Sequence, residues 1–410
     1  MESNRTIRAV HLENFLSFGS KGESLELHPL NVMIGPNASG KSNLIEALRI
    51  LSTTPTEVAN AIEAGGGITE YLWKGTAAAS TAKIEVEVGW PAHLSSLRYK
   101  LEFTNRQWAQ LPNFTITQES IAQINSQGEE LFPEIYHYRY GERGSLYSIN
   151  PQYNPDEDSL DKKYLFQEVN QGGSGNKSIL YLIRNPDRHP ELDRLENVFA
   201  KIQFYQGLEF NRNSSIRRPQ STNLPTDVLW ENASNLGLIL NNFPQRTKHL
   251  VVEKLKEVYE PIEEIQTRIQ GGQVGVFIQE KGLSAPISAL RLSEGTLRYL
   301  CLLVSLLSPT PPPLICLEEP ESGLHPDVID SLAQMLVEAS EKTQLIVTTH
   351  SDRLISALAN AGAVDSVVVC ERRPSGTQLN RLDAVRLKKW LEKYSLGELW
   401  SMGEIGGTRW

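Results

Sequence analysis

A loop that could hold phosphate groups follows an apolar stretch near the start of the chain. Its sequence is Gly35-Pro36-Asn37-Ala38-Ser39-Gly40-Lys41-Ser42, which fits the pattern G-x-x-x-x-G-K-[ST]. Glycines allow backbone N–H groups to point into a shared hollow, and a following helix adds partial positive charge. In this pattern Lys41 spans the β- and γ-phosphates and the Ser42 hydroxyl binds Mg²⁺. The sequence therefore predicts a nucleotide site that extends to Asn43.

Two acidic residues could complete this site from a distant part of the chain. Leu314–Leu317 predict a buried strand, and Glu318 and Glu319 stand at its carboxyl end, where open α/β sheets bind ligands. Adjacent side chains on a strand point opposite ways, so the pair can serve one site only if the strand ends there. We assign Glu318 to the Mg²⁺ shell and Glu319 to the water that attacks the γ-phosphate. Without a neighbouring phosphate loop, such a pair would indicate a solvated turn.

A second helix start could also face an anion. Ser293, Glu294 and Gly295 precede an apolar segment of helical spacing, which makes Ser293 an expected N-cap with a cluster of free amides. The alternative is an ordinary capped core helix. One nucleotide has no need of two such helix ends unless they act on it from opposite sides.

One histidine lies where it could reach the reacting phosphate. His350 ends the apolar segment 343–349, which predicts a buried strand, so its ring could contact the γ-phosphate or the attacking water. Lone histidines are more often structural, and only the position favours a role here. The other seven histidines lack metal-like spacing, so we predict no zinc site.

The elements around these residues predict an α/β fold. Two strands are expected at 7–15 and 25–35, a helix from Lys41 to about residue 51, and antiparallel strands at 82–90 and 97–103. Residues 105–175 are polar and poorly periodic, which indicates loops and short hairpins. Residues 178–259 are helical in pattern, followed by strands at 265–270 and 273–280. Alternating apolar strands and helices over 292–351 are typical of a parallel sheet.

Composition excludes several classes of protein. The chain has 410 residues, more than one compact core usually covers, and 22% of them are charged, as in soluble globular proteins. We find no membrane span and no signal peptide, so we expect a cytoplasmic protein without a membrane partner. The three cysteines, Cys301, Cys316 and Cys370, stand in apolar surroundings and are expected as reduced core thiols.

Small basic clusters and an aromatic tail could contact partners. The clusters contain Arg212, Arg217 and Arg218, and Arg386, Lys388 and Lys389. Because the net charge is −9, DNA contact would need such local patches, although exposed basic residues are usually only solvated surface. Trp400 and Trp410 predict a packed structural tail, with a docking strip for a partner as the alternative.

The order of the motifs resembles that of ABC-type ATPases. GPNASGKS is followed by LSEGT, LICLEEPE, SGLHP and TTHS, and the segments NFLSFG and EEPESGLHP are similar to the RecF/SMC and OLD-like branch. The resemblance covers residues 1–55 and 285–355. The middle matches only in layout, with a helical insertion where SMC relatives carry a coiled coil.

The resemblance implies a two-lobed ABC-type P-loop ATPase head that acts as a head-to-tail homodimer. Each ATP, with Mg²⁺, would lie between the P-loop of one protomer and the LSEGT signature segment of the other, where Ser293 and Gly295 would contact it. Ser322, Gly323 and Leu324 would form the D-loop at the dimer seam. Lys41, Glu319 and His350 would be the catalytic residues, with His350 as the switch histidine.

This sequence departs from the family pattern in three places. Glu294 adds a negative charge in the signature segment, and Glu318 replaces the usual Asp, which makes weaker metal binding or slow turnover plausible. No glutamine is marked as that of the Q-loop, although Gln167 and Gln171 precede the helical insertion. Only about sixty residues follow His350, too few for a fused nuclease domain of usual size, so a nuclease effector would be a separate protein.

We therefore predict three parts: lobe I over 1–175, a helical insertion over 176–260 and lobe II over 261–410. The expected function is ATP binding and slow hydrolysis coupled to dimer closure, in control of a separate effector in DNA maintenance or antiphage defence. The alternatives are a transporter motor, a RecF-like DNA-repair clamp without a nuclease, and a scaffold that binds nucleotide without hydrolysing it.

Overall fold

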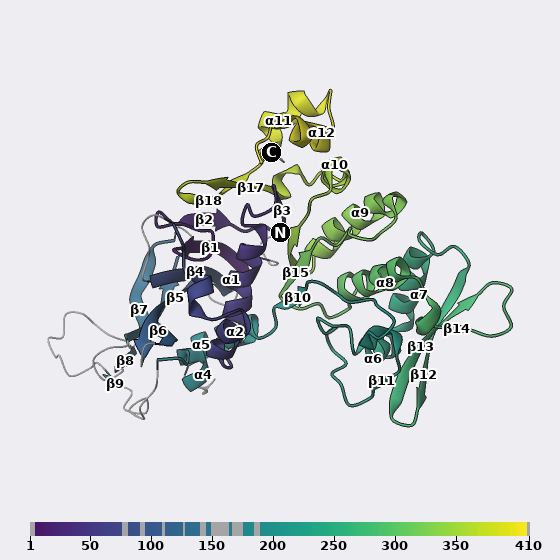
Figure 1. Cartoon of the computed structure of the whole chain (residues 1–410), viewed down its shortest axis with the longest axis horizontal. Coiled ribbons are helices and arrows are strands. Elements are labelled where there is room, and N and C mark those ends of the chain that lie inside the picture. The colour runs from purple at the N-terminus through teal and green to yellow at the C-terminus, as the bar shows by residue number, and fades with distance from the viewer. Residues whose placement is uncertain are drawn as a thin grey trace.

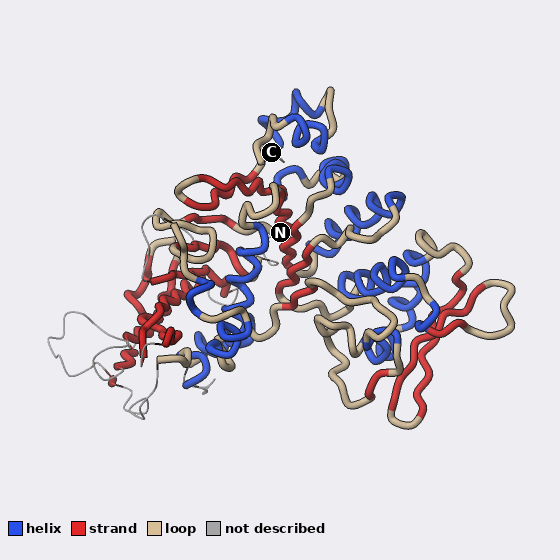
Figure 2. Tube along the Cα trace, in the orientation of Figure 1, coloured by secondary structure: helices blue, strands red, loops and turns tan. Residues whose placement is uncertain are grey.

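The computed structural model describes residues 5–75, 81–90, 95–108, 111–125, 128–139, 145–148, 164–165, 175–183 and 189–407. Three sheets organise these residues (Figure 1). Figure 2 shows a strand-rich body at one side, a central sheet, and a second body of helices and strands at the other side. Within the described residues, no helix has both the length and the apolar character needed to cross a membrane.

The first sheet is antiparallel and has eight strands. Their order is β2 (Glu23–Glu26), β1 (Ile7–Glu13), β4 (Thr81–Trp90), β5 (Ser95–Trp108), β6 (Leu111–Ile124), β7 (Glu130–Arg139), β8 (Ser145–Ser148) and β9 (Tyr164–Leu165). In β4 every second side chain is buried, from Ala82 to Val88. This alternation buries one face of the strand and leaves the other partly solvated. The predicted antiparallel strands at 82–90 and 97–103 are confirmed.

The prediction of loops and short hairpins for residues 105–175 is wrong for β6 and β7, which are long paired strands. The register shifts between Glu102 and Phe103, and again between Ile121 and Gln123. Because such an irregularity interrupts the period of two, the alternation cannot be followed through this segment. The sheet also tolerates polar residues on the face away from Phe114 and Ile116, which are buried.

The second sheet is the parallel sheet that the sequence predicts. Its order is β10 (Gln203–Tyr205), β15 (Leu314–Glu318), β16 (Gln344–Thr348), β3 (Leu30–Ile34), β17 (Val367–Arg373) and β18 (Gly376–Arg381), with only β18 antiparallel. The single strand predicted at 25–35 is therefore wrong. Its first half is β2 of the first sheet and its second half is β3, divided at Pro29, which lacks the N–H that a central strand needs.

The parallel sheet separates two hydrophobic cores. Met33, Cys316 and Ile346 face the core that holds the first sheet, α1 (Lys41–Thr53), α2 (Val58–Ala64), α3 (Ile68–Tyr71), α4 (Ile179–Leu182) and α5 (Pro190–Phe199). Val32 and Ile315 face the other core, which holds α6 (Leu236–Asn242), α7 (Gln245–Leu255), α8 (Glu294–Leu306), α9 (Ile329–Ser340) and α10 (Asp352–Asn360). Figure 1 shows these helices on opposite sides of the sheet. The predicted α/β fold is confirmed.

The segment predicted as one helical insertion, 176–260, contributes to both cores. Its helices α4 and α5 pack with the first sheet, whereas α6 and α7 pack with α8. Between them β10 forms the edge of the parallel sheet, with Phe204 in one core and Tyr205 in the other. The boundaries at 175 and 260 remain predictions. A third, antiparallel sheet follows with β11 (Gln220–Ser221), β12 (Ile262–Gln270), β13 (Gln273–Glu280) and β14 (Ile287–Ser288).

The chain ends in two helices, α11 (Ala384–Leu391) and α12 (Leu396–Met402). The Trp400 side chain is buried, and its indole N–H donates to the Gly407 carbonyl over 2.8 Å. The packed tail predicted from the sequence is confirmed for these residues, whereas Trp410 lies outside the described residues. All three cysteines are free and buried, as predicted.

One buried carboxyl group makes the stability of the first lobe depend on pH. The Tyr99 and Ser178 hydroxyls each donate to Glu119 Oε1 over 2.5 Å, and the Ile179 N–H donates to Oε2 over 2.8 Å. Burial raises the pKa of Glu119 from 4.5 to about 7. The folded state therefore binds this proton more tightly than the unfolded state does, and this stabilisation is lost as the pH rises from 4.5 through about 7.

Because the pKa rises from 4.5 to about 7, we expect the loss to reach about 3 kcal/mol of unfolding free energy above pH 7. Urea unfolding of the wild type and of Glu119→Gln between pH 4.5 and 8 measures it. The contribution of Glu119 is the difference between the two proteins in the slope of unfolding free energy against pH. Equal slopes in the two proteins would contradict the assignment.

Candidate functional site

The phosphate loop joins β3 to α1 in the way its sequence predicts. Gly35 and Gly40 have φ values of 147° and 105°, and Ala38 has a φ of 62°. A Cβ atom on Gly35 would lie 2.3 Å from the Cys370 carbonyl oxygen, and one on Gly40 would lie 2.4 Å from Thr377 Oγ1. Both contacts are too short for any side chain, so these two positions require glycine for space as well as for conformation.

Residues from both ends of the chain support this loop. The Thr377 hydroxyl lies 2.8 Å from the Ser39 carbonyl oxygen and 2.7 Å from Ser17 Oγ. The Asn43 side-chain amide also donates to Ser17 Oγ, over 2.7 Å. Ser17 belongs to the NFLSFG segment and Thr377 is the second residue of β18, so the shape of the loop depends on segments 360 residues apart.

Lys41 and Ser42 begin α1 at the mouth of the loop. The Lys41 ammonium donates to the carbonyl oxygens of Gly35 and Pro36 over 2.8 and 2.9 Å. Burial lowers the pKa of Lys41. The Ser42 hydroxyl donates to a carboxylate oxygen of Glu318, so the P-loop and the end of β15 meet at one point.

The backbone after β15 allows two adjacent glutamates to serve the same site. The strand ends at Glu318, and Glu319 has a φ of 44°, a left-handed turn that is uncommon for a residue with a side chain. The Glu319 N–H donates to the Thr348 carbonyl at the end of β16 over 2.9 Å. The Glu319 Oε1 atom lies 3.2 Å from His350 Nε2. The strand thus ends where the sequence-based assignment requires it to.

A third glutamate, Glu321, supports this corner and is missing from the sequence-based list. Its Oε1 atom accepts from the Thr349 hydroxyl and, over 3.4 Å, from the His350 N–H. Its Oε2 atom is buried without a hydrogen-bond partner among the described residues. Burial raises the pKa of Glu321, and the neighbouring Glu319 charge adds to this effect. In the sequence, only the position of Glu321 two residues after Glu319 could have indicated this role.

A glutamine that the sequence analysis does not mark also reaches the site. Gln206 directly follows β10, the strand that pairs in parallel with β15. Together with Ser42, Glu46, Glu318 and other residues, it lines a cavity of about 370 Å³. The two glutamines considered from the sequence, Gln167 and Gln171, lie outside the described residues. The signal for Gln206 is its place directly after the short apolar segment IQFY.

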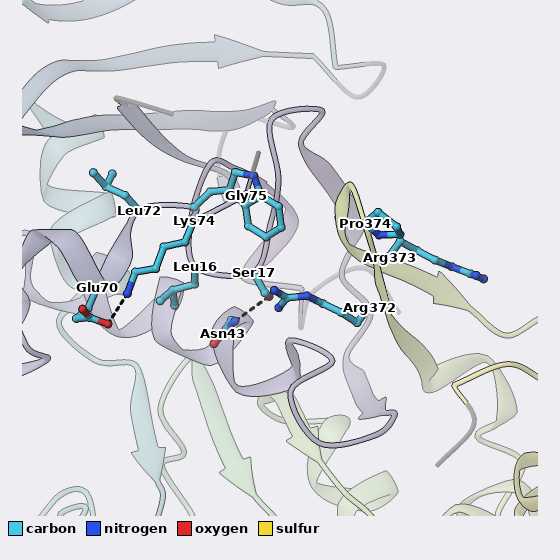
Figure 3. A pocket seen from close by; sticks show the side chains of 11 residues that line it. Leu16, Ser17, Asn43, Glu70, Leu72, Lys74, Gly75, Arg372, Arg373 and Pro374 are labelled. Atoms are coloured by element: carbon cyan, nitrogen blue, oxygen red, sulfur yellow. Dashed lines mark hydrogen bonds and ion pairs between the residues drawn. The ribbon is translucent and has the colours of Figure 1, made fainter. Parts of the chain in front are cut away.

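A second cavity, of about 650 Å³, continues from the first, because Leu16, Asn43 and Glu70 line both. Figure 3 shows it between the loop that carries Lys74 and the β17–β18 hairpin that carries Arg372. The Arg372 guanidinium lies 5.5 Å from the centre of the Trp73 ring, and the Lys74 ammonium pairs with Glu70 at 2.6 Å. The two cavities form one groove along the start of α1.

The signature segment is built as predicted. Ser293 caps α8, and its hydroxyl oxygen accepts from the Thr296 N–H over 3.0 Å. A Cβ atom on Gly295 would lie 3.1 Å from the Gly323 carbonyl oxygen, so this segment packs against the predicted D-loop. Neither cavity of the groove is lined by residues 293–295, since all their described lining residues come from other segments.

Arg217 is not available to contact nucleic-acid phosphates, and it is not the solvated surface residue that was the alternative. Its side chain is buried, and its guanidinium donates to the carbonyls of Phe210 over 2.8 Å and of Leu292 over 2.6 Å. Burial is stable here because carbonyl oxygens satisfy the charged donors. Arg217 therefore holds the residue before the signature serine. Arg212 and Arg218 are exposed, as are Arg386, Lys388 and Lys389 on α11.

Comparison with known families decides the family of the chain. The family described as "AAA domain, putative AbiEii toxin, Type IV TA system" matches residues 30–139 and 171–356. The chain belongs to this AAA family. No curated protein matches it.

Solved structures similar to this AAA-family chain include SMC heads. One is an SMC head bound to the C-terminal winged-helix domain of ScpA, with 12% identity, a TM-score of 0.54, and 93% of this chain and 99% of that chain covered. Another is an SMC head with an extended coiled coil from Pyrococcus furiosus, bound to the C-terminal domain of ScpA, with 12% identity, a TM-score of 0.53, and 94% and 98% covered. At this identity the likeness establishes the fold, an ABC-type ATPase head.

Proposed function

We propose that the chain is an ATPase that closes as a head-to-tail homodimer around two ATP molecules. The observation that supports this most is the separation of two anion-binding elements. Lys41, Ser42 and Glu318 meet at one groove, whereas Ser293 caps a different helix and lines neither cavity of that groove. A second protomer would bring its Ser293 and Gly295 to the nucleotide held by the first.

The groove fits the nucleotide in the following way. Free backbone N–H groups of the loop and the Lys41 ammonium bind the phosphates, and the cavity beside Trp73 and Arg372 holds the nucleoside. The donors at Ser42 and Glu318 are hard oxygens, which suit Mg²⁺. Two further hydroxyls in this region, Ser39 Oγ and Thr348 Oγ1, are buried without a partner among the described residues. Bound Mg²⁺ supplies charge neutralisation at the phosphates.

Glu319, His350 and Gln206 then have separate roles in hydrolysis. Glu319 accepts a hydrogen bond from the attacking water and takes its proton, because its carboxylate turns out of the strand toward the site. His350 holds that carboxylate and, by the resemblance to ABC-type ATPases, would contact the terminal phosphate. Gln206 is our candidate for the Q-loop glutamine, which contacts the metal shell or the water from the side of β10.

We further propose that dimer closure regulates a separate effector protein, such as a nuclease, in DNA maintenance or antiphage defence. The resemblance to OLD-like ATPases supports this, and so does the family description, which names a toxin of a toxin–antitoxin system. A RecF-like clamp that acts on DNA without a nuclease is the second candidate, supported by the exposed basic residues of α11. Binding to gapped DNA that requires ATP but no second protein would favour the clamp.

The dimer is tested most directly at Ser293. We expect Ser293→Arg to bind ATP as a monomer like the wild type but not to dimerise, because the long cation would occupy the space of the trans phosphates. Light scattering with and without ATP, at equal protein concentrations, measures this. Ser284→Arg, at an exposed serine between β13 and β14 that lines neither cavity of the groove, is the control. An ATP-driven dimer of Ser293→Arg would remove the trans site from the mechanism.

A further inference from the structure

An arginine of the P-loop helix is bound by groups from two other parts of the chain. Arg49 lies on α1, two turns after Ser42. Its guanidinium donates to both carboxylate oxygens of Glu231, over 2.7 and 3.0 Å. It also donates to Gln206 Oε1 over 2.7 Å, and its Cζ atom lies 4.4 Å from the centre of the Phe204 ring. The planar fork of an arginine makes all these contacts at once, which a lysine ammonium cannot do.

The three residues joined by these hydrogen bonds, Arg49, Gln206 and Glu231, belong to different layers of the molecule. Arg49 is on a helix of the first core, and Gln206 stands at the edge of the parallel sheet, where it lines the cavity with Ser42 and Glu318. Glu231 lies in the turn before α6, which packs against α8 in the second core. Arg49 therefore connects the helix that follows the P-loop with the layer that carries the signature segment.

The contact also fixes which end of the Gln206 amide faces the cavity. An arginine has only donors, so the Gln206 oxygen must face Arg49. The NH₂ end is then the part left for groups in the cavity. Without Arg49 the amide could rotate, and the donor would no longer be held beside Ser42 and Glu318.

We propose that Arg49 is a positioning residue for hydrolysis: it orients Gln206 and makes that orientation depend on how Glu231 and the α6–α8 layer sit against α1. This inference rests on the proposed ATPase function. Dimer closure would move the layer that carries the signature segment. Because the Arg49 guanidinium binds both Glu231 beside that layer and Gln206 at the groove, this movement would change the orientation of Gln206.

The test is steady-state phosphate release by Arg49→Lys, which keeps the charge but loses the fork. We expect kcat to fall about tenfold with KM within about twofold of the wild type, since misplacing a group near the reacting atoms slows chemistry more than binding. Glu231→Gln should show the same split with a smaller loss. Its side chain is 43% exposed, so this variant does not disturb a core.

The double variant separates positioning from general damage. Because Arg49 and Glu231 act as one unit, Arg49→Lys with Glu231→Gln should be no slower than Arg49→Lys alone, and multiplied losses would overturn the coupling. Arg194→Lys is the matched control, a half-buried arginine that donates to the Gly89 carbonyl and should keep the wild-type kcat.

Two outcomes overturn the proposal at different levels. If the wild type releases phosphate and both single variants keep its kcat, Arg49 has no positioning role, while the proposed ATPase activity stands. A wild-type chain that binds ATP without releasing phosphate would overturn the proposed hydrolysis and the role of Arg49 with it.

Discussion

Glu319→Gln should reduce phosphate release by about a hundredfold or more, the usual effect of removing a general base. The amide keeps the shape of the carboxylate and still reaches His350, so the corner between β15 and β16 stays folded. It cannot take the proton of the attacking water. The variant also removes a negative charge beside the terminal phosphate, so ATP binding should be retained or strengthened, and the ATP-bound dimer should accumulate.

Single-turnover phosphate release and size-exclusion chromatography with ATP measure the two effects in one preparation. Glu341→Gln, an exposed glutamate at the end of α9, is the matched control and should behave as wild type. Equal rates for the wild type and Glu319→Gln would reject the catalytic assignment. If both rates are equally low, the chain is a scaffold that binds nucleotide without turnover.

Lys41→Ala should weaken ATP binding by about a hundredfold, or about 3 kcal/mol, because a charge-assisted contact to two phosphates is lost in a partly buried site. The fold should remain. The loop keeps its shape without the ammonium, because the Thr377 hydroxyl still donates to the Ser39 carbonyl and the Asn43 amide still donates to Ser17 Oγ. Calorimetric titration with ATP and Mg²⁺ measures the affinity, and circular dichroism checks the fold.

Lys83→Ala is the control for the loss of a lysine, since Lys83 pairs with Glu85 at 2.7 Å on the antiparallel sheet. It should keep the wild-type affinity. ATP binding by Lys41→Ala at wild-type affinity would mean that phosphates do not enter the loop, and the groove would need another ligand.

The parts of the site that local sequence determines could be predicted. The P-loop follows from glycine spacing, the cap of α8 from Ser293, and the end of β15 from the apolar run that stops at Glu318. Each of these depends on neighbours within a few residues. The α/β fold was predictable for the same reason, since long apolar strands and helices alternate over 292–351.

The parts that depend on distant packing could not be predicted. Gln206 follows a strand of three residues whose partner, β15, lies far along the sequence, so no periodicity marks it. Arg217 has the composition of a surface cation, and only the tertiary structure supplies the carbonyls that bury it. The strands β6 and β7 were missed because irregular register hides their alternation.

The central position of β3 has a consequence for how the protein is made. Its neighbours in the sheet, β16 and β17, follow it only after several hundred residues, and Asn31 bonds to Leu345 across 314 residues. Closing so long a segment is slow, and until then an apolar strand has both edges unpaired. The nucleotide site therefore cannot take shape on the ribosome before β16 and β17 have been synthesised, and until then the apolar strand β3 is exposed to aggregation.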